Sequence, residues 1–122
     1  MDENTRNPAL DRSMVKLAPG RSFYLKRQRD GVGDSGPCLR SLKWPEGKDQ
    51  VRMSDLIPTG GHGEIHVGCK IECGAITART YGMQDFWLTT EVTEFLDVVE
   101  TEDGVTKVTF QTRNSVYEAG VI

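Results

Sequence analysis

The sequence predicts a mainly β fold, a small antiparallel barrel or sandwich, and three observations support this. Five glycines between residues 60 and 74 would each destabilise a helix interior. Within residues 105–112, Val108 and Phe110 share one face with Thr106 and Thr112, which is typical of a half-buried strand. Asp103-Gly104 precedes this stretch, and Asp-Gly favours the tight turn of a β-hairpin. Roughly six to eight short strands in a chain of this length are typical of a compact barrel or sandwich.

The first twenty residues differ from the rest. They are polar and mixed in charge, with one short apolar pattern at Leu10, Met14 and Leu17. We therefore expect residues 1–20 to form a loose arm or a short helix. The remaining residues, 21–122, are expected to form a single β-rich domain, because 122 residues are too few for two stable cores.

In the first half of this domain the pattern is irregular. Residues 22–28 have the aromatic content of a strand, and residues 29–37 are so rich in turn-forming residues that they predict a long loop. A second strand is expected within 39–44. Residues 53–57 predict one helical turn that Pro58 stops.

From residue 60 onward the strand pattern is clearer. Apolar residues alternate with polar ones around Ile65, and residues 75–81 carry β-branched side chains without a helical period. Residues 90–100 are expected to pair with 105–112 as a hairpin. The step Phe95-Leu96 breaks the alternation and predicts a β-bulge. A last strand is expected within 115–121.

Charge and cysteine content restrict the class of protein. The net charge is −3, so we expect no non-specific binding of duplex DNA, which requires many cations to neutralise phosphates. Residues 21–48 are nevertheless basic and residues 82–122 acidic. Three cysteines, an odd number, indicate free thiols in a reducing compartment. The apolar stretches are far too short for a membrane span, so we expect a cytoplasmic protein that does not bind a membrane.

The clearest candidate metal ligands lie close together in the sequence, at His62, His66, Cys69 and Cys73. This residue set is that of a structural zinc site. The intervals match no familiar zinc motif, and in an extended chain His66 and Cys69 point to opposite faces. We expect no metal. A zinc site is kept as an alternative, because turns at Gly63 and Gly68 would bring the four side chains together.

Two glycine-rich patterns resemble known enzyme motifs. Residues 31–36 spell G-x-G-x-x-G, but Pro37 follows where a dinucleotide fold needs a helix. Residues 33–37, Gly-Asp-Ser-Gly-Pro, resemble the nucleophile region of trypsin-like proteases, yet both histidines follow the serine and the chain is too short. A flexible loop is the simpler interpretation.

Acidic residues of the predicted hairpin could suggest acid–base catalysis. On a two-residue period Glu91 and Asp97 share one face and Glu94 and Glu100 the other, with no nucleophile nearby in the sequence. We interpret them as solvated side chains. The sequence therefore predicts neither an enzyme nor a cofactor.

The remaining signal is a mixture of cations and aromatic rings. Guanidinium groups bind phosphates and aromatic faces stack on bases, so this mixture favours a small nucleotide as ligand, although arginines at strand ends are often solvated and a core needs aromatics. The candidate residues are Arg21, Lys26, Arg27, Arg29, Arg79 and Arg113 among the cations, and Phe23, Tyr24, Tyr81, Phe86 and Trp87 among the aromatics.

The second half also carries a resemblance. Residues 78–95, with the pair Phe86-Trp87, and residues 108–118, with Thr112-Arg113-Asn114-Ser115-Val116-Tyr117, resemble small uncharacterised proteins of phages and bacteria. More loosely they resemble the phage anti-Thoeris proteins that sequester a cyclic ADP-ribose signal. This resemblance implies a β-rich homo-oligomer that binds a nucleotide without chemistry, with a binding role for Phe86, Trp87, Arg113 and Asn114.

The sequence thus predicts a phage anti-defence protein that sequesters a small signalling nucleotide, of the cyclic ADP-ribose type or a cyclic oligonucleotide, in the cytoplasm of an infected bacterial host. The expected ligand-binding residues are Lys26, Arg27, Arg79, Phe86, Trp87, Arg113 and Asn114. An alternative is a protein-binding inhibitor or accessory module that acts through the acidic hairpin. A metal-dependent hydrolase is the third possibility.

Overall fold

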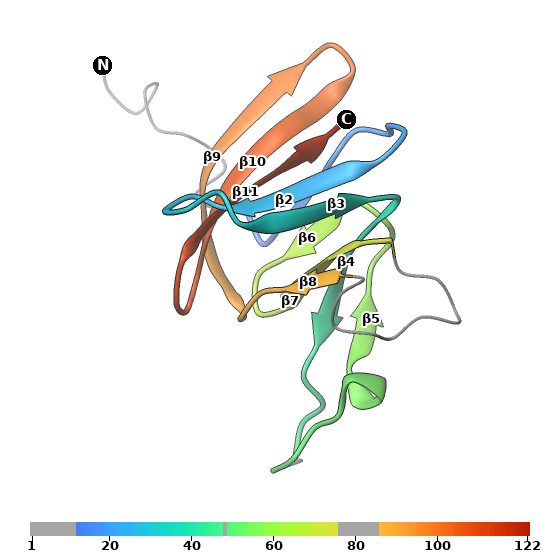
Figure 1. Ribbon diagram of the computed structural model, residues 1–122, viewed down its shortest axis with the longest axis vertical. Coiled ribbons are helices and arrows are strands. Elements are labelled where there is room, and N and C mark those ends of the chain that lie inside the picture. Colours follow the sequence, from blue (N-terminus) through green and yellow to red (C-terminus); the bar gives the residue numbers. More distant parts are fainter. Residues whose placement is uncertain (1–11, 48, 76–85) are drawn as a thin grey trace.

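Strands account for almost all regular structure in the computed structural model, which describes residues 12–47, 49–75 and 86–122 (Figure 1). A five-stranded antiparallel sheet contains, in spatial order, β3 (Gly33–Gly36), β2 (Phe23–Arg27), β11 (Val116–Val121), β10 (Gly104–Thr112) and β9 (Val92–Thr101). A four-stranded sheet contains β5 (Ile57–Thr59), β4 (Cys38–Lys43), β7 (Lys70–Gly74) and β8 (Phe86–Leu88). A third sheet pairs β1 (Met14–Lys16) with β6 (Glu64–His66).

This arrangement confirms the predicted mainly β fold in its sandwich form. Within the described residues the sheets stay open and do not close into a barrel. The described part of the chain contains no helix that is both long and apolar enough to cross a membrane.

One buried apolar cluster joins the three sheets. Leu25 of β2, Leu39 of β4, Ile65 of β6 and Phe110 of β10 belong to it and are almost completely shielded from solvent. Side chains along β2 and much of β10 alternate between buried and partly exposed, as a pleated sheet with one face on a core requires. The core therefore fixes which face of each strand is left for the surface.

The hairpin predicted in the second half is confirmed. β9 pairs antiparallel with β10, and Gly104 adopts a φ of +114° next to the turn, a conformation that favours glycine. Phe95 pairs with Phe110 while Asp97 pairs with Thr109, so Leu96 is the extra residue of a β-bulge, as the sequence predicted. The last strand, predicted within 115–121, is β11, paired between β10 and β2.

The prediction of a long loop at 29–37 is wrong, because β3 occupies Gly33–Gly36 and pairs with β2. The turn is confined to the residues before it. A side chain at Gly33 would put its Cβ 1.8 Å from the carbonyl oxygen of Leu25, and one at Gly36 would collide with Gly74. These glycines permit close approach of neighbouring strands, which sequence analysis interpreted as turn formation.

The prediction of a loose arm or short helix at residues 1–20 is corrected for residues 12–20, which the structure describes. Met14–Lys16 forms β1, which pairs with β6, and Val15 and Leu17 are buried. The spacing of Met14 and Leu17 suggested a helix, but tertiary pairing determines the structure here. Residues 1–11 lie outside the described part of the chain.

The helical turn predicted at 53–57 corresponds to a short 3₁₀ helix, η3 (Met53–Asp55). Pro58, however, lies inside β5. β5 is an edge strand, where a residue without a backbone N–H is tolerated. The strands predicted at 22–28 and 39–44 correspond to β2 and β4, whereas most of 75–81 lies outside the described residues.

Candidate functional site

A surface hollow of about 440 Å³ forms where the ends of several strands meet. Its side chains come from the end of β4, the start of β7, the β8–β9 connection and the β10–β11 turn. The lining residues are Trp44, Lys70, Thr90, Glu91 and Arg113.

The β8–β9 connection is held in place by β7. The backbone N–H of Thr89 donates to the carbonyl of Ile71 over 3.0 Å, and the N–H of Ile71 donates to the Thr89 hydroxyl over 3.0 Å. The N–H of Val92 donates to the carbonyl of Cys69 over 2.9 Å. Thr90 and Glu91 therefore lie on a segment fixed at both ends.

The β10–β11 turn brings Arg113 to the same segment. Within the turn, the N–H groups of Thr112 and Ser115 donate to the Ser115 carbonyl and the Thr112 hydroxyl, over 2.8 and 3.2 Å. The backbone N–H of Arg113 donates to the Glu91 carbonyl over 3.1 Å, and its guanidinium lies 3.6 Å from the Glu91 carboxylate. The Arg113 side chain is 70% exposed, so its other N–H donors face solvent.

Lys70 and Trp44 form the other side of the hollow. Lys70 pairs with Leu42 across β7 and β4, and Trp44 follows two residues later in the chain. The Lys70 ammonium lies 5.5 Å from the centre of the Trp44 ring, within cation–π range. Trp44 is 40% exposed, so part of this large apolar side chain is open to solvent.

The hollow therefore combines two cations, a carboxylate, a hydroxyl and an exposed ring. Cations bind phosphate oxygens, and an indole face can stack on a base or a sugar. Glu91 and Thr90 can accept hydrogen bonds from ligand hydroxyl or amino groups. This set of groups is chemically suited to a small polar anion.

The structure places two of the predicted site residues, Arg27 and Trp87, in another cluster. The Arg27 guanidinium lies 5.2 Å from the Trp87 ring centre, and the Trp87 indole N–H donates to the Tyr117 hydroxyl over 3.2 Å. Arg27 also donates twice to Asp30, over 2.8 and 3.1 Å, and this pairing lowers the pKa of Asp30. Trp87 therefore lies with Arg27 and Tyr117 and is not among the residues that line the hollow with Arg113.

The other predicted residues are dispersed. Lys26 lines a separate hollow of about 330 Å³ over β2 and β3, and its ammonium lies 3.8 Å from Glu118. Asn114 is exposed in the β10–β11 turn, where its N–H lies 3.4 Å from the Thr112 hydroxyl. Arg79 and the Phe86 side chain lie outside the described part of the structure.

The structure does not bring together the candidate metal ligands His62, His66, Cys69 and Cys73. The Cys73 thiol lies 3.9 Å from the carbonyl oxygen of Phe23, and burial raises its pKa to about 12, far from the thiolate that zinc requires. His66 instead faces Glu64, 3.0 Å away. Among the described residues no three His, Cys, Asp or Glu side chains converge as a metal site would require. The expected absence of zinc stays a prediction.

Comparison of the chain with protein-family models, curated proteins and solved structures gives no match. The resemblance to anti-Thoeris proteins therefore stays a prediction. The Thr-x-Asn-Ser-x-Tyr pattern that carried it has a structural role here, since its Thr and Ser close the turn and Tyr117 is buried in the core.

Sequence analysis identified Arg113 but missed its neighbours in the hollow. Glu91 was interpreted as a solvated hairpin residue, and Trp44 as the end of a strand. The one signal for Trp44 in the sequence is its place directly before the turn residues Pro45-Glu46-Gly47. Connecting segments run over the protein surface, so a ring beside one can be exposed.

Proposed function

We propose that the protein binds a small nucleotide without chemistry, in the hollow lined by Trp44, Lys70, Thr90, Glu91 and Arg113, and acts by sequestering it. The observation that carries this proposal is the meeting of an exposed indole ring with two cations in one hollow. The role in phage anti-defence and the assembly into a homo-oligomer remain part of the proposal, supported by the sequence resemblance alone.

Trp44 and Arg113 contribute different kinds of contact to the proposed binding. The face of Trp44 offers stacking to a base, which is worth about 1–3 kcal/mol for each base. Arg113 offers several N–H donors to phosphate oxygens, and a hydrogen bond to a charged group is worth about 1.5–3 kcal/mol. The hollow needs no large rearrangement to admit a ligand, because hydrogen bonds to β7 already hold the β8–β9 connection.

Substitutions in the hollow are expected to separate by mechanism. Trp44→Ala should weaken nucleotide binding by about 1–3 kcal/mol with little change in salt dependence, because stacking is not a charge effect. Arg113→Ala should weaken it by about 1.5–3 kcal/mol and make the remaining affinity less sensitive to salt. Titration calorimetry at two salt concentrations, with cyclic ADP-ribose isomers and cyclic di- and trinucleotides, measures both effects.

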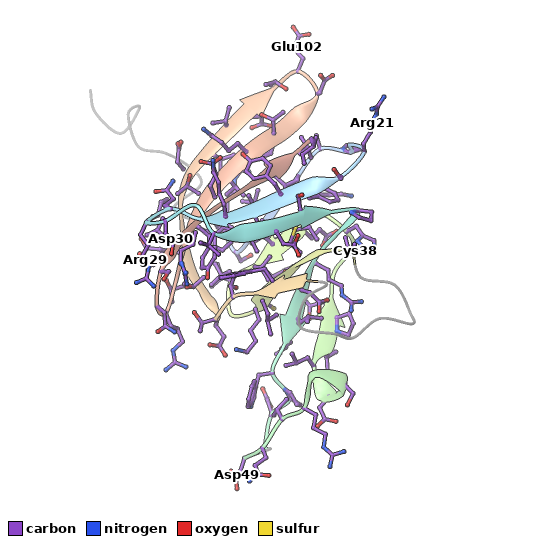
Figure 2. The ribbon with its side chains drawn as sticks, viewed as in Figure 1. Arg21, Arg29, Asp30, Cys38, Asp49 and Glu102 are labelled. Atoms are coloured by element: carbon purple, nitrogen blue, oxygen red, sulfur yellow. The ribbon has the colours of Figure 1, made fainter. Side chains whose placement is uncertain are left out.

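Arg21→Ala is the matched control. It removes the same charge and side chain from an exposed position that Figure 2 places well away from the β10–β11 turn. Its binding should equal that of the parent protein. Equal losses in Arg21→Ala and Arg113→Ala would show that net charge, rather than this hollow, determines binding. Chromatography of the recovered ligand checks that it leaves unchanged.

A second function is favoured by one observation on the hairpin. β9 and β10 project from the sandwich (Figure 1), and their exposed acidic residues include Glu94, Asp97, Glu100, Glu102 and Asp103. Such a surface suits a basic protein partner. Failure of every nucleotide in the calorimetric panel, together with capture of a basic protein that Glu100→Lys abolishes, would support this alternative.

A further inference from the structure

The charges around the hollow do not act independently. The Arg113 guanidinium and the Glu91 carboxylate are 3.6 Å apart, so each largely offsets the other. Lys70 lies over the Trp44 ring, a neutral partner. The lining residues thus present one ion pair and one cation that lies over a neutral ring instead of beside a carboxylate.

We propose that the hollow selects a phosphate that carries a single negative charge, that of a phosphodiester, over the doubly charged phosphate of a terminal monoester, with Glu91 as the residue that determines this selection. The inference rests on the proposed nucleotide binding and names the class of nucleotide that the site accepts.

The argument follows from charge matching. A diester phosphate has one charge, which Lys70 balances, while the outward N–H donors of Arg113 hold a phosphate oxygen. A monoester has a charge of about −2 above pH 7. Its second charge loses water beside the Glu91 carboxylate without gaining an unshared cation, and an unpaired charge is costly to desolvate.

The backbone around Thr90 and Glu91 is held in place by hydrogen bonds. The N–H groups of Thr89 and Val92 donate to the carbonyls of Ile71 in β7 and of Cys69 directly before it, and the N–H of Arg113 donates to the Glu91 carbonyl. The Glu91 side chain is 26% exposed and lines the hollow beside Arg113. A phosphate that reaches Arg113 therefore approaches this carboxylate as well.

The test uses ligands that differ by one charge. Adenosine and guanosine 5′-monophosphates are compared with their 5′-(methyl phosphate) esters at pH 8 by titration calorimetry. In the parent protein the methyl esters should bind about 3- to 10-fold more tightly, the scale of one charge interaction over a few ångströms of water. In Glu91→Gln this preference should disappear or reverse, because Arg113 becomes available to the second charge.

Glu102→Gln is the control for net charge. It removes the same charge from the tip of the β9–β10 hairpin (Figure 2). This tip precedes the start of β10, whereas Arg113 and the hollow lie at the other end of that strand. It should leave the preference for the methyl ester unchanged, while thermal melting shows that both variants are folded.

The outcomes separate the two proposals. Equal or tighter binding of the monoesters by the parent protein overturns the charge selection and leaves nucleotide binding intact. The charge selection by Glu91 is also overturned if Glu91→Gln and Glu102→Gln change the preference for the methyl ester to the same extent. If neither monoesters nor methyl esters bind, the charge selection fails, and the calorimetric panel of cyclic nucleotides decides nucleotide binding separately.

Discussion

Phe110→Ala is expected to lower the free energy of unfolding by about 3–5 kcal/mol, the range for loss of a buried aromatic and the cavity it leaves. Phe110 of β10 is completely buried, and its ring stacks on Tyr117 with 5.9 Å between the ring centres. The substitution removes apolar contacts from strands of the same sheet. Equilibrium denaturation in urea, followed by tryptophan fluorescence, measures the effect.

Val99→Ala is the matched control on the same hairpin. Val99 is 38% exposed, so its truncation should change stability by less than about 0.5 kcal/mol, as is usual for surface positions. If Phe110→Ala is as stable as the parent protein, the assignment of β10 to the core is wrong.

Arg40→Met is expected to lower the free energy of unfolding by about 3 kcal/mol. Arg40 donates from Nε to the Glu72 carboxylate over 2.7 Å, and Glu72 is only 2% exposed. Removing the cation leaves a buried charge without its partner, which costs about 3–5 kcal/mol in other proteins. The lower end applies because the Arg40 side chain is 31% exposed and water can reach its place.

A double variant distinguishes lost charge compensation from lost packing. Arg40→Met combined with Glu72→Met should recover most of the stability, because an apolar pair can replace a buried ion pair at little cost. Arg29→Met, which breaks an exposed 3.9 Å contact with Asp30, should cost less than about 1 kcal/mol. A double variant as unstable as the single one contradicts this account of the Arg40–Glu72 pair.

The sequence predicted the elements whose signals are local. The hairpin of β9 and β10 could be recognised because alternation, an Asp-Gly turn and the break at Phe95-Leu96 all lie within about two dozen neighbouring residues. The β10–β11 turn could be recognised for the same reason. In these segments local preference and tertiary structure agree.

Strands that depend on distant partners could not be predicted. β3 consists of glycine and polar residues, and nothing in that stretch shows that Gly33 must pass close to Leu25. β1 is short and becomes a strand only through its pairing with β6, some fifty residues away in the chain. Local patterns contain no information on such pairings.

The candidate site shows the same limit. Arg113 was found because it lies in a recognisable turn, whereas Trp44 and Lys70 meet only through the pairing of β4 with β7. Trp87 was chosen for its chemistry, and its contact with Arg27 depends on strands more than fifty residues apart. Residue type indicated the kind of ligand, but the residues that line a common hollow follow from the register of the sheets.

The most direct test of nucleotide binding in the hollow uses the two tryptophans of the chain. Each indole N–H gives a separate signal in a ¹H–¹⁵N correlation spectrum, and Trp44→Phe and Trp87→Phe assign the two signals. Titration with a nucleotide that binds in calorimetry should shift the Trp44 signal and leave the Trp87 signal, whose N–H is held by Tyr117, nearly unchanged. A shift of the Trp87 signal alone, or of neither signal at saturation, would contradict the account.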